Sequence, residues 1–207
     1  ALGSAMALPV KSYKVIGGMT PKLSGEDFYF LQKLRKYGNI IIYNTEKVFP
    51  AARFSDRVFF GTGPAMIKGN TGNWESYPIY HHHLFKHVFD TYACFPVLFK
   101  EDIKTPLSDF LDEQLHTNNI WVLLRKNNKD ENHFVRACYE KVDGLRVLQY
   151  LKFAQEKINM TDETCLLENM NIYNQYLEIP DAILSNDVSF AKSPIYELDL
   201  IRNYLVQ

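Results

Sequence analysis

The sequence predicts an α+β protein that is mostly α, with a glycine-rich front part containing short strands and a helical back part. Nine of the ten glycines lie within the first 72 residues, so turns are concentrated there. The β-branched run Asn39–Tyr43 is typical of a buried strand, whereas later segments repeat apolar residues at helical spacing. We place a boundary near Gly69–Trp74 and expect two parts, residues 1–73 and 74–207.

Composition narrows the class of protein. The chain has 207 residues, of which 46% are hydrophobic and 23% charged, as in a globular protein with a sizeable core. The net charge of −1 argues against a general nucleic-acid binder. Three widely spaced cysteines without a CxxC pattern imply neither a disulfide framework nor a zinc ribbon. No run approaches the length of a membrane span, and Ala1–Val10 does not resemble a signal peptide.

The front part is expected to alternate short strands with turns and one good helix. The strands are expected at Gly3–Leu8, Asn39–Tyr43 and Lys47–Pro50. A short helix or turn over Val10–Ile16 is closed by a double glycine, and Ala51–Gly63 is expected to be a loop.

The helix over Ser24–Gly38 has a paired carboxylate at its start. Ser24 is the expected N-cap, and Glu26 and Asp27 fall in the first turn, where the helix dipole favours negative charge. Acids at such positions commonly serve only to stabilise the helix. The functional alternative is that a glycine turn presents a rigidly held general base.

A basic loop offers a second candidate site. Arg53 and Arg57 flank Ser55, and the turn Gly61-Thr62-Gly63 follows. Guanidinium groups match phosphate oxygens, and glycines let backbone N–H groups approach an anion. The alternative is a loop held by surface salt bridges, because this pattern is neither a P-loop nor a dinucleotide-binding fingerprint.

The back part is expected to be helical throughout. The expected helices cover Tyr77–Ala93, Pro106–Leu115, Asp130–Val142, Leu145–Ile158, Asp162–Leu177 and Pro194–Val206, and the run Asn119–Lys126 is ambiguous. In the first of them, His83 and His87 share a face at i, i+4, with Asp90 nearby. Two such histidines could hold a metal, with Asp90 as a possible further ligand, but no third ligand is evident from the pattern; polar helix surface or satisfied core histidine is the alternative.

Four segments of the front part resemble those of a known family, the bacterial family-2 glycosyltransferases of GT-A fold. The matching pieces occur in the family's order: Gly3–Ala7, the aromatic-x-x-x-Gly-Gly-Met turn Tyr13–Met19, the Gly-Glu-Asp helix from Gly25, and Pro50–Arg57. Each piece alone is weak, but the order and spacing of all four are fairly specific. The resemblance covers residues 1 to about 68 and implies a partial GT-A-like α/β segment.

The resemblance also implies roles for individual residues. In such inverting enzymes the aspartate of the Glu-Asp pair is assigned as the general base, which carries over to Asp27, with Glu26 orienting the acceptor. The resemblance places the donor diphosphate near the basic loop, at Arg53, Ser55 and Arg57. It places the acceptor pocket near the double glycine, Gly17 and Gly18.

The family's nucleotide-binding half precedes the matched stretch and has no counterpart in these residues. That half carries the D-x-D motif, so the divalent metal, Mn²⁺ or Mg²⁺, would have few ligands here. We therefore expect an acceptor-side portion that is inactive alone, and a strand edge at Ile40–Ile42 that favours self-association.

The implied partners are a nucleotide-sugar donor and a glycan or lipid-linked acceptor, as in polysaccharide biosynthesis. The implied location is the cytoplasm or the inner face of the membrane. The alternative from another class is a non-catalytic helical interaction module. The helical back part, residues 74–207, resembles no family.

Overall fold

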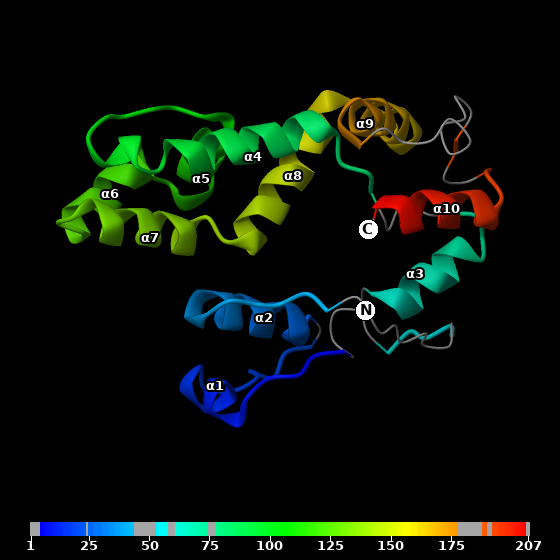
Figure 1. Cartoon of the computed structure of the whole chain (residues 1–207), viewed down its shortest axis with the longest axis horizontal. Coiled ribbons are helices and arrows are strands. Elements are labelled where there is room, and N and C mark those ends of the chain that lie inside the picture. Colours follow the sequence, from blue (N-terminus) through cyan, green and yellow to red (C-terminus); the bar gives the residue numbers. More distant parts are fainter. Residues whose placement is uncertain are drawn as a thin grey trace. The chain divides into compact units, whose positions relative to one another are not determined.

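Helices make up all the regular secondary structure in the described part of the chain. This structure, a computed structural model, describes residues 5–23, 25–43, 53–57, 61–73, 78–177, 188–189 and 192–205. The chain divides into unit 1, Ala1–Tyr77, and unit 2, Pro78–Gln207. Figure 1 shows the helices of both units in sequence colours.

The predicted α+β class, with its GT-A-like α/β segment, is therefore wrong for the described residues. Residues 5–8 and 39–43 form no strand, and Lys47–Pro50 lies outside the described ranges. A strand needs a neighbour that accepts and donates its ladder hydrogen bonds. The run that was expected to be buried is instead open to solvent, with Ile41 88% and Ile42 81% exposed. The expected self-association assumed an exposed strand edge at Ile40–Ile42, and these residues form no strand.

Unit 1 contains three described helices: α1 (Val10–Val15), α2 (Glu26–Tyr37) and α3 (Thr62–Gly69). The predicted short helix before the double glycine and the predicted acidic helix are both confirmed. The third begins inside the expected loop and was missed. The expected cap Ser24 lies outside the described residues, and Gly25, with φ of 72°, occupies the N-cap position of α2.

The turn after α1 is anchored on α2. The rings of Tyr13 and Phe30 lie 5.8 Å apart, and the Lys33 Nζ donates to the Gly18 carbonyl oxygen at 3.3 Å and to the Thr20 hydroxyl at 2.8 Å. Gly18 has φ of +67°, and a Cβ there would lie 2.9 Å from the Tyr13 ring. Glycine is required at this position because a side chain would meet both strain and a clash.

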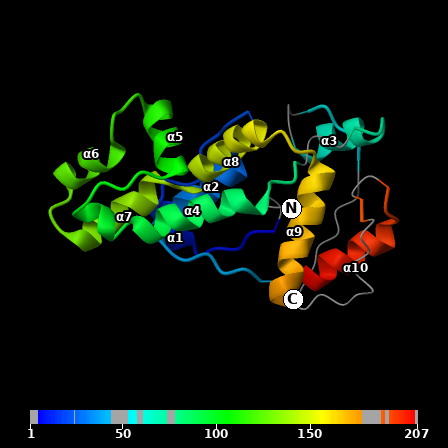
Figure 2. The same cartoon turned by 90° about the horizontal axis from the view of Figure 1, so that it is seen from above.

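Unit 2 confirms the predicted helical back part. Its described elements are α4 (His82–Cys94), the short 3₁₀ helix η1 (Val97–Phe99), α5 (Pro106–Leu115), α6 (Ile120–Asn127), α7 (Glu131–Lys141), α8 (Gly144–Ile158), α9 (Asp162–Leu177) and α10 (Ile195–Leu205). Helices α5 and α9 have the predicted bounds, and the ambiguous run is helix α6. Helices α9 and α10 lie side by side at one end of the unit (Figure 2).

Side-chain caps explain where several of these helices begin. The Thr105 hydroxyl accepts from the Ser108 amide, and the Ser108 hydroxyl accepts from the Thr105 amide, which makes a reciprocal capping box across the first turn of α5. The side chains of Asn119, Asp130 and Asp143 accept from backbone N–H groups in the first turns of α6, α7 and α8.

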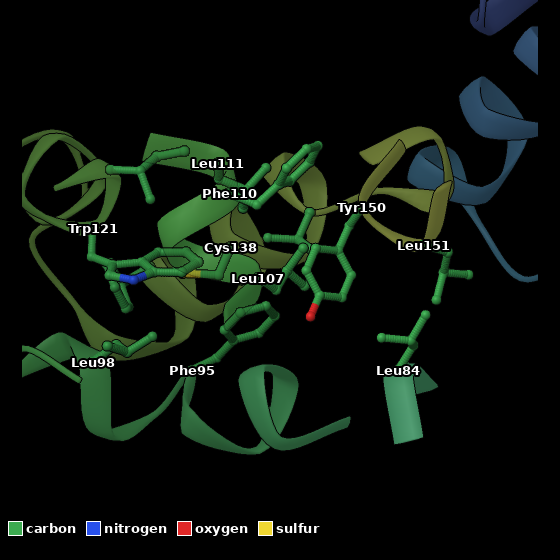
Figure 3. Packing of buried hydrophobic residues seen from close by; sticks show 13 residues of the cluster. Leu84, Phe95, Leu98, Leu107, Phe110, Leu111, Trp121, Cys138, Tyr150 and Leu151 are labelled. Carbon is green, nitrogen blue, oxygen red and sulfur yellow. The ribbon is translucent and has the colours of Figure 1, made fainter. Parts of the chain in front are cut away.

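The main core of unit 2 gathers side chains from α4 to α8. Figure 3 shows Trp121 and Cys138 packed beside Phe95, and the rings of Phe95 and Trp121 lie 5.8 Å apart. A smaller cluster joins α9 to α10 around Met170 and Ile201. Helix α4 contacts α5, α8 and α9 and therefore connects these parts of the unit.

Candidate functional site

A cavity of about 630 Å³ lies among α4, α5 and α8 of unit 2. Most of its lining surface is apolar, although polar residues contribute at least as many side chains. The apolar residues are Leu84, Pro106, Phe110, Phe153, Ala154 and Ile158, and the polar ones are His81, His83, His87, Asp109, Glu113, Tyr150 and Lys157. The volume falls in the range of small-molecule sites, which are mostly apolar with a few convergent polar groups.

A histidine–tyrosine pair forms a partly buried polar contact in the wall of this cavity. The Tyr150 hydroxyl lies 2.6 Å from the His87 Nδ1, and Tyr150 is 2% exposed. Burial raises the pKa of the Tyr150 phenol to about 12, so the phenol keeps its hydrogen at neutral pH. The His87 Nδ1 is the partner recorded for this hydroxyl in the described structure, and we therefore assign the hydroxyl as the donor to it. Burial, followed by the nearby His83, lowers the pKa of His87 below its ordinary 6.5. His87 is therefore neutral near pH 7, and its remaining hydrogen is on Nε2.

The charged groups of the lining lie toward solvent. Asp109 and Glu113 are exposed residues one turn apart on α5, and Lys157 is an exposed residue near the end of α8. The Lys157 Nζ lies 3.8 Å from the centre of the Phe153 ring. The polar rim thus carries two carboxylates and one ammonium group around an apolar interior.

A histidine–carboxylate pair ties the start of α4 to α9. The His81 Nε2 lies 2.6 Å from the Glu168 Oε2, and the His81 Nδ1 accepts from the His83 amide at 3.2 Å. Because Nδ1 is an acceptor, the imidazole hydrogen is on Nε2 and is donated to the carboxylate. The amides of His81 and His82 donate to Gln155 and Asn169, which fixes the same segment to α8 and α9.

His81, His82 and Glu168 also form the group of side chains in the described structure whose spacing suits a metal ion. The hydrogen bonds oppose that use, since a cation at the His81 Nε2 would need the lone pair that the hydrogen now occupies. Two imidazoles and one carboxylate are also a poor set for Mn²⁺ or Mg²⁺, which prefer oxygen ligands. These residues therefore do not fit the expected metal, and we assign them to holding α4 against α9.

The other proposed histidine face does not converge on a metal either. The rings of His83 and His87 meet edge to face with centres 4.6 Å apart, and the His87 Nδ1 is engaged by Tyr150. Asp90 accepts two hydrogen bonds from Lys86, at 2.8 and 2.9 Å. Each of these groups is thus held by a neighbour on the protein.

The paired carboxylates predicted as catalytic lie at the first turn of α2. Glu26 is exposed and Asp27 is half-buried. The Asp27 Oδ1 accepts from the Phe28 amide at 2.7 Å, which fixes one carboxylate oxygen. Gly17 and Gly18, the predicted acceptor-pocket residues, both have positive φ and form the turn that Lys33 binds to α2.

The predicted donor-binding residues lie in the loop before α3. Arg53 and Arg57 are exposed, and the Arg57 amide donates to the Ser55 hydroxyl at 3.4 Å. A Cβ at Gly63 would lie 2.4 Å from the Ser55 carbonyl oxygen, so only glycine lets α3 begin against this loop. Among the described residues, the structure records no contact between these arginines and the carboxylates of α2.

Apart from His83 and His87, which the sequence offered as a possible metal-binding face, the cavity residues were not predicted as a site. The sequence predicted a helix over Tyr77–Ala93, and it gave no sign that His87 and Tyr150, 63 positions apart, would meet. Such a contact depends on the packing of α4 against α8 and has no local pattern.

Comparisons with protein families, with curated proteins and with solved structures find no match to this chain. None of the described helices is both long enough and apolar enough to cross a membrane.

Proposed function

We propose that this chain is the acceptor-side part of an inverting family-2 glycosyltransferase, which moves a sugar from a nucleotide-diphosphate donor to a hydroxyl of a glycan or lipid-linked acceptor. The observation that carries the proposal is the ordered set of four motifs in the first 68 residues or so. The local geometry supports it, because the double-glycine turn and the carboxylate-bearing helix α2 are hydrogen-bonded to each other.

In this proposal Asp27 takes the proton from the acceptor hydroxyl as its oxygen attacks the anomeric carbon. One oxygen of Asp27 is held by the Phe28 amide, which leaves the other for the acceptor. Glu26, exposed beside it, orients the acceptor.

The bond from the anomeric carbon to the diphosphate breaks in the same step, and the leaving group gains negative charge. Arg53 and Arg57 are suited to bind such a group because their guanidinium groups donate paired hydrogen bonds to phosphate oxygens. The Ser55 hydroxyl, which accepts from the Arg57 amide, keeps the donor loop in shape. No step is assigned to a metal, since the described residues do not fit the expected ion. Such an enzyme would act in the cytoplasm or at the inner face of the membrane.

The experiment is a transfer assay on the intact protein that contains these residues, with a panel of nucleotide-sugar donors. Asp27→Asn should lower the transfer rate by about 10²–10⁴-fold, the usual contribution of a general base, while donor binding persists. Arg53→Ala and Arg57→Ala should instead weaken donor-diphosphate binding, measured by titration.

The matched control is Asp90→Asn, which changes an aspartate that accepts from Lys86 on the surface of α4. It should leave transfer unchanged. Transfer at the wild-type rate in Asp27→Asn would remove this residue from the role of base. Unchanged donor affinity in both arginine variants would assign their loop a structural role.

A non-catalytic helical interaction module is the second candidate. One observation favours it: almost all the buried apolar residues in the described structure lie in unit 2, which contains none of the four motifs. Failure of the intact protein to transfer any sugar in the donor panel would favour this function over the enzyme.

A further inference from the structure

The cavity among α4, α5 and α8 is separate from the motifs of unit 1, and its chemistry can be derived without them. Its wall residues come from three helices that also build the main core, so the cavity belongs to the packed part of unit 2. Protein interiors are otherwise filled to the density of organic crystals. An apolar space of about 630 Å³ is far larger than a packing defect and is suited to a guest molecule.

The interior of the cavity selects for an apolar body. Phe110 and Phe153 pack with ring centres 4.9 Å apart, and Phe110 also meets the Tyr150 ring at 5.7 Å. Leu84 and Ile158 extend this surface on α4 and α8. A polar guest would lose its hydration here without recovering hydrogen bonds from these walls.

One polar group in the wall is oriented by the protein. With the Tyr150 hydroxyl assigned as the donor to the His87 Nδ1, the neutral imidazole carries its hydrogen on Nε2. No acceptor for that Nε2 hydrogen is recorded in the described structure. An oxygen of a guest molecule can accept it, which would orient the guest.

An uncharged guest fits this cavity better than a charged one. Two carboxylates, Asp109 and Glu113, oppose one ammonium group, Lys157, which disfavours an anion. A cation would lose its hydration in the apolar interior, and the neutral His87, with its hydrogen on Nε2, offers it no lone pair there. We propose that this cavity is a binding site for an uncharged amphiphile, whose apolar body fills the space between Phe110, Phe153 and Leu84 and whose hydroxyl or carbonyl oxygen accepts from the His87 Nε2.

The test compares three probes that share one chain and differ in charge: octanol, octanoate and octylamine. Calorimetric titration of the full chain near pH 7 should show saturable one-site binding of octanol. Octanoate and octylamine should bind at least about tenfold more weakly, because their charges would have to be desolvated beside an apolar wall.

A cavity-filling variant locates the site. Ala154→Leu adds a larger side chain to the lining and removes no hydrogen bond, so it should abolish octanol binding while the protein stays folded. The matched control is Ala93→Leu, the same change at an exposed position of α4, which should leave the affinity unchanged.

A second pair of variants tests the hydrogen bond. Tyr150→Phe keeps the imidazole as a possible donor but no longer holds its tautomer, so octanol affinity should fall by about two- to threefold, less than in the double variant. The double variant His87→Phe with Tyr150→Phe removes both polar partners together, which avoids leaving either one buried alone, and should weaken octanol binding about tenfold. Equal affinity in the single and double variants would contradict the assigned role of His87.

Three results would overturn the proposal as a whole. They are the absence of saturable octanol binding, tighter binding of either charged probe, and unchanged affinity in Ala154→Leu. None of them bears on sugar transfer by the motifs of unit 1, so failure of this inference is distinguishable from failure of the proposed enzyme.

Discussion

In unit 1, the buried apolar side chains that the structure describes are Phe30 and Ala65, whereas unit 2 buries a continuous cluster from Leu84 to Leu151 and a second one around Met170. Both units contain helices with favourable ends. Acidic residues occupy the first turn of α2, just as side-chain caps begin α5 to α8. Sequence features that favour helix ends therefore occur in both units, but only in unit 2 do the described helices pack around a large apolar core.

The difference shows that motif content and core content are separate properties of this chain. Unit 1 holds all the residues proposed for catalysis and leaves large apolar side chains exposed, among them Leu23 and Ile41. Helical stability in proteins comes mostly from packing an apolar face against neighbours. We expect the two units to respond very differently to the loss of similar side chains.

The largest expected difference is in the core. Phe134→Ala, at a fully buried position of α7, should lower the free energy of unfolding of unit 2 by about 3–5 kcal/mol, through lost burial and the resulting cavity. Phe30→Ala is the matched change in unit 1 and should leave the transition of unit 2 unchanged. Denaturant unfolding followed by circular dichroism measures both. An equal loss in the two variants would mean that the units unfold as one.

A helix cap gives a smaller effect. Thr105→Ala removes the acceptor of the α5 capping box and a buried contact of 2.8 Å with the Thr91 hydroxyl, so it should cost about 1–2 kcal/mol. Thr161→Ala removes a similar but exposed contact, in which the Thr161 hydroxyl accepts from the Thr164 amide, and should cost about 0.5–1 kcal/mol. The same unfolding measurement compares the two variants. A larger loss of stability in Thr161→Ala than in Thr105→Ala would contradict the idea that burial strengthens the cap at Thr105.

The free energy of unfolding measured below about pH 6.5 should depend on the protonation of His87. The pKa of His87 is lowered in the folded protein, so below the ordinary value of 6.5 the unfolded chain binds the proton first. Stability should therefore fall as pH drops from about 6.5 to the lowered pKa, and level off below it. The neighbouring charges are Lys86, Asp90 and His83 on α4, Asp109 and Glu113 on α5, and Lys157 on α8.

The paired variant His87→Phe with Tyr150→Phe should flatten this part of the profile. Thermal unfolding measured across the acid range gives the comparison. A profile of unchanged slope in the double variant would assign the acid sensitivity to another group.

The last prediction concerns the reactivity of the cysteines of unit 2 and involves no change in stability. Burial raises the pKa of the Cys138 thiol to about 12, and Cys138 and Cys165 are both fully buried. A thiol reagent should modify the partly exposed Cys94 first in the native protein, and all three after unfolding. Mass spectrometry identifies the modified residue, and rapid labelling of Cys138 would contradict the packing of the main core.

Most helix positions in unit 2 could be predicted because their signals are local. Thr105 and Pro106 mark the start of α5, and the apolar repeats of α8 and α9 define their lengths. The strand at Asn39–Tyr43 was predicted wrongly because a β-branched run indicates a preference, while a strand exists only with a partner. Helix α3 was missed because its glycines and proline resemble a loop.

By itself, the sequence determined the helical character of most of residues 78–177, with Asn119–Lys126 left ambiguous, and the motifs on which the proposed sugar transfer rests. These depend on neighbours within a few positions along the chain, which a sequence displays directly. Tertiary structure alone decided that Tyr150 meets His87, that His81 binds Glu168, and that α4, α5 and α8 line a cavity. Such contacts join residues tens of positions apart, and they arise from how whole helices pack rather than from any local pattern.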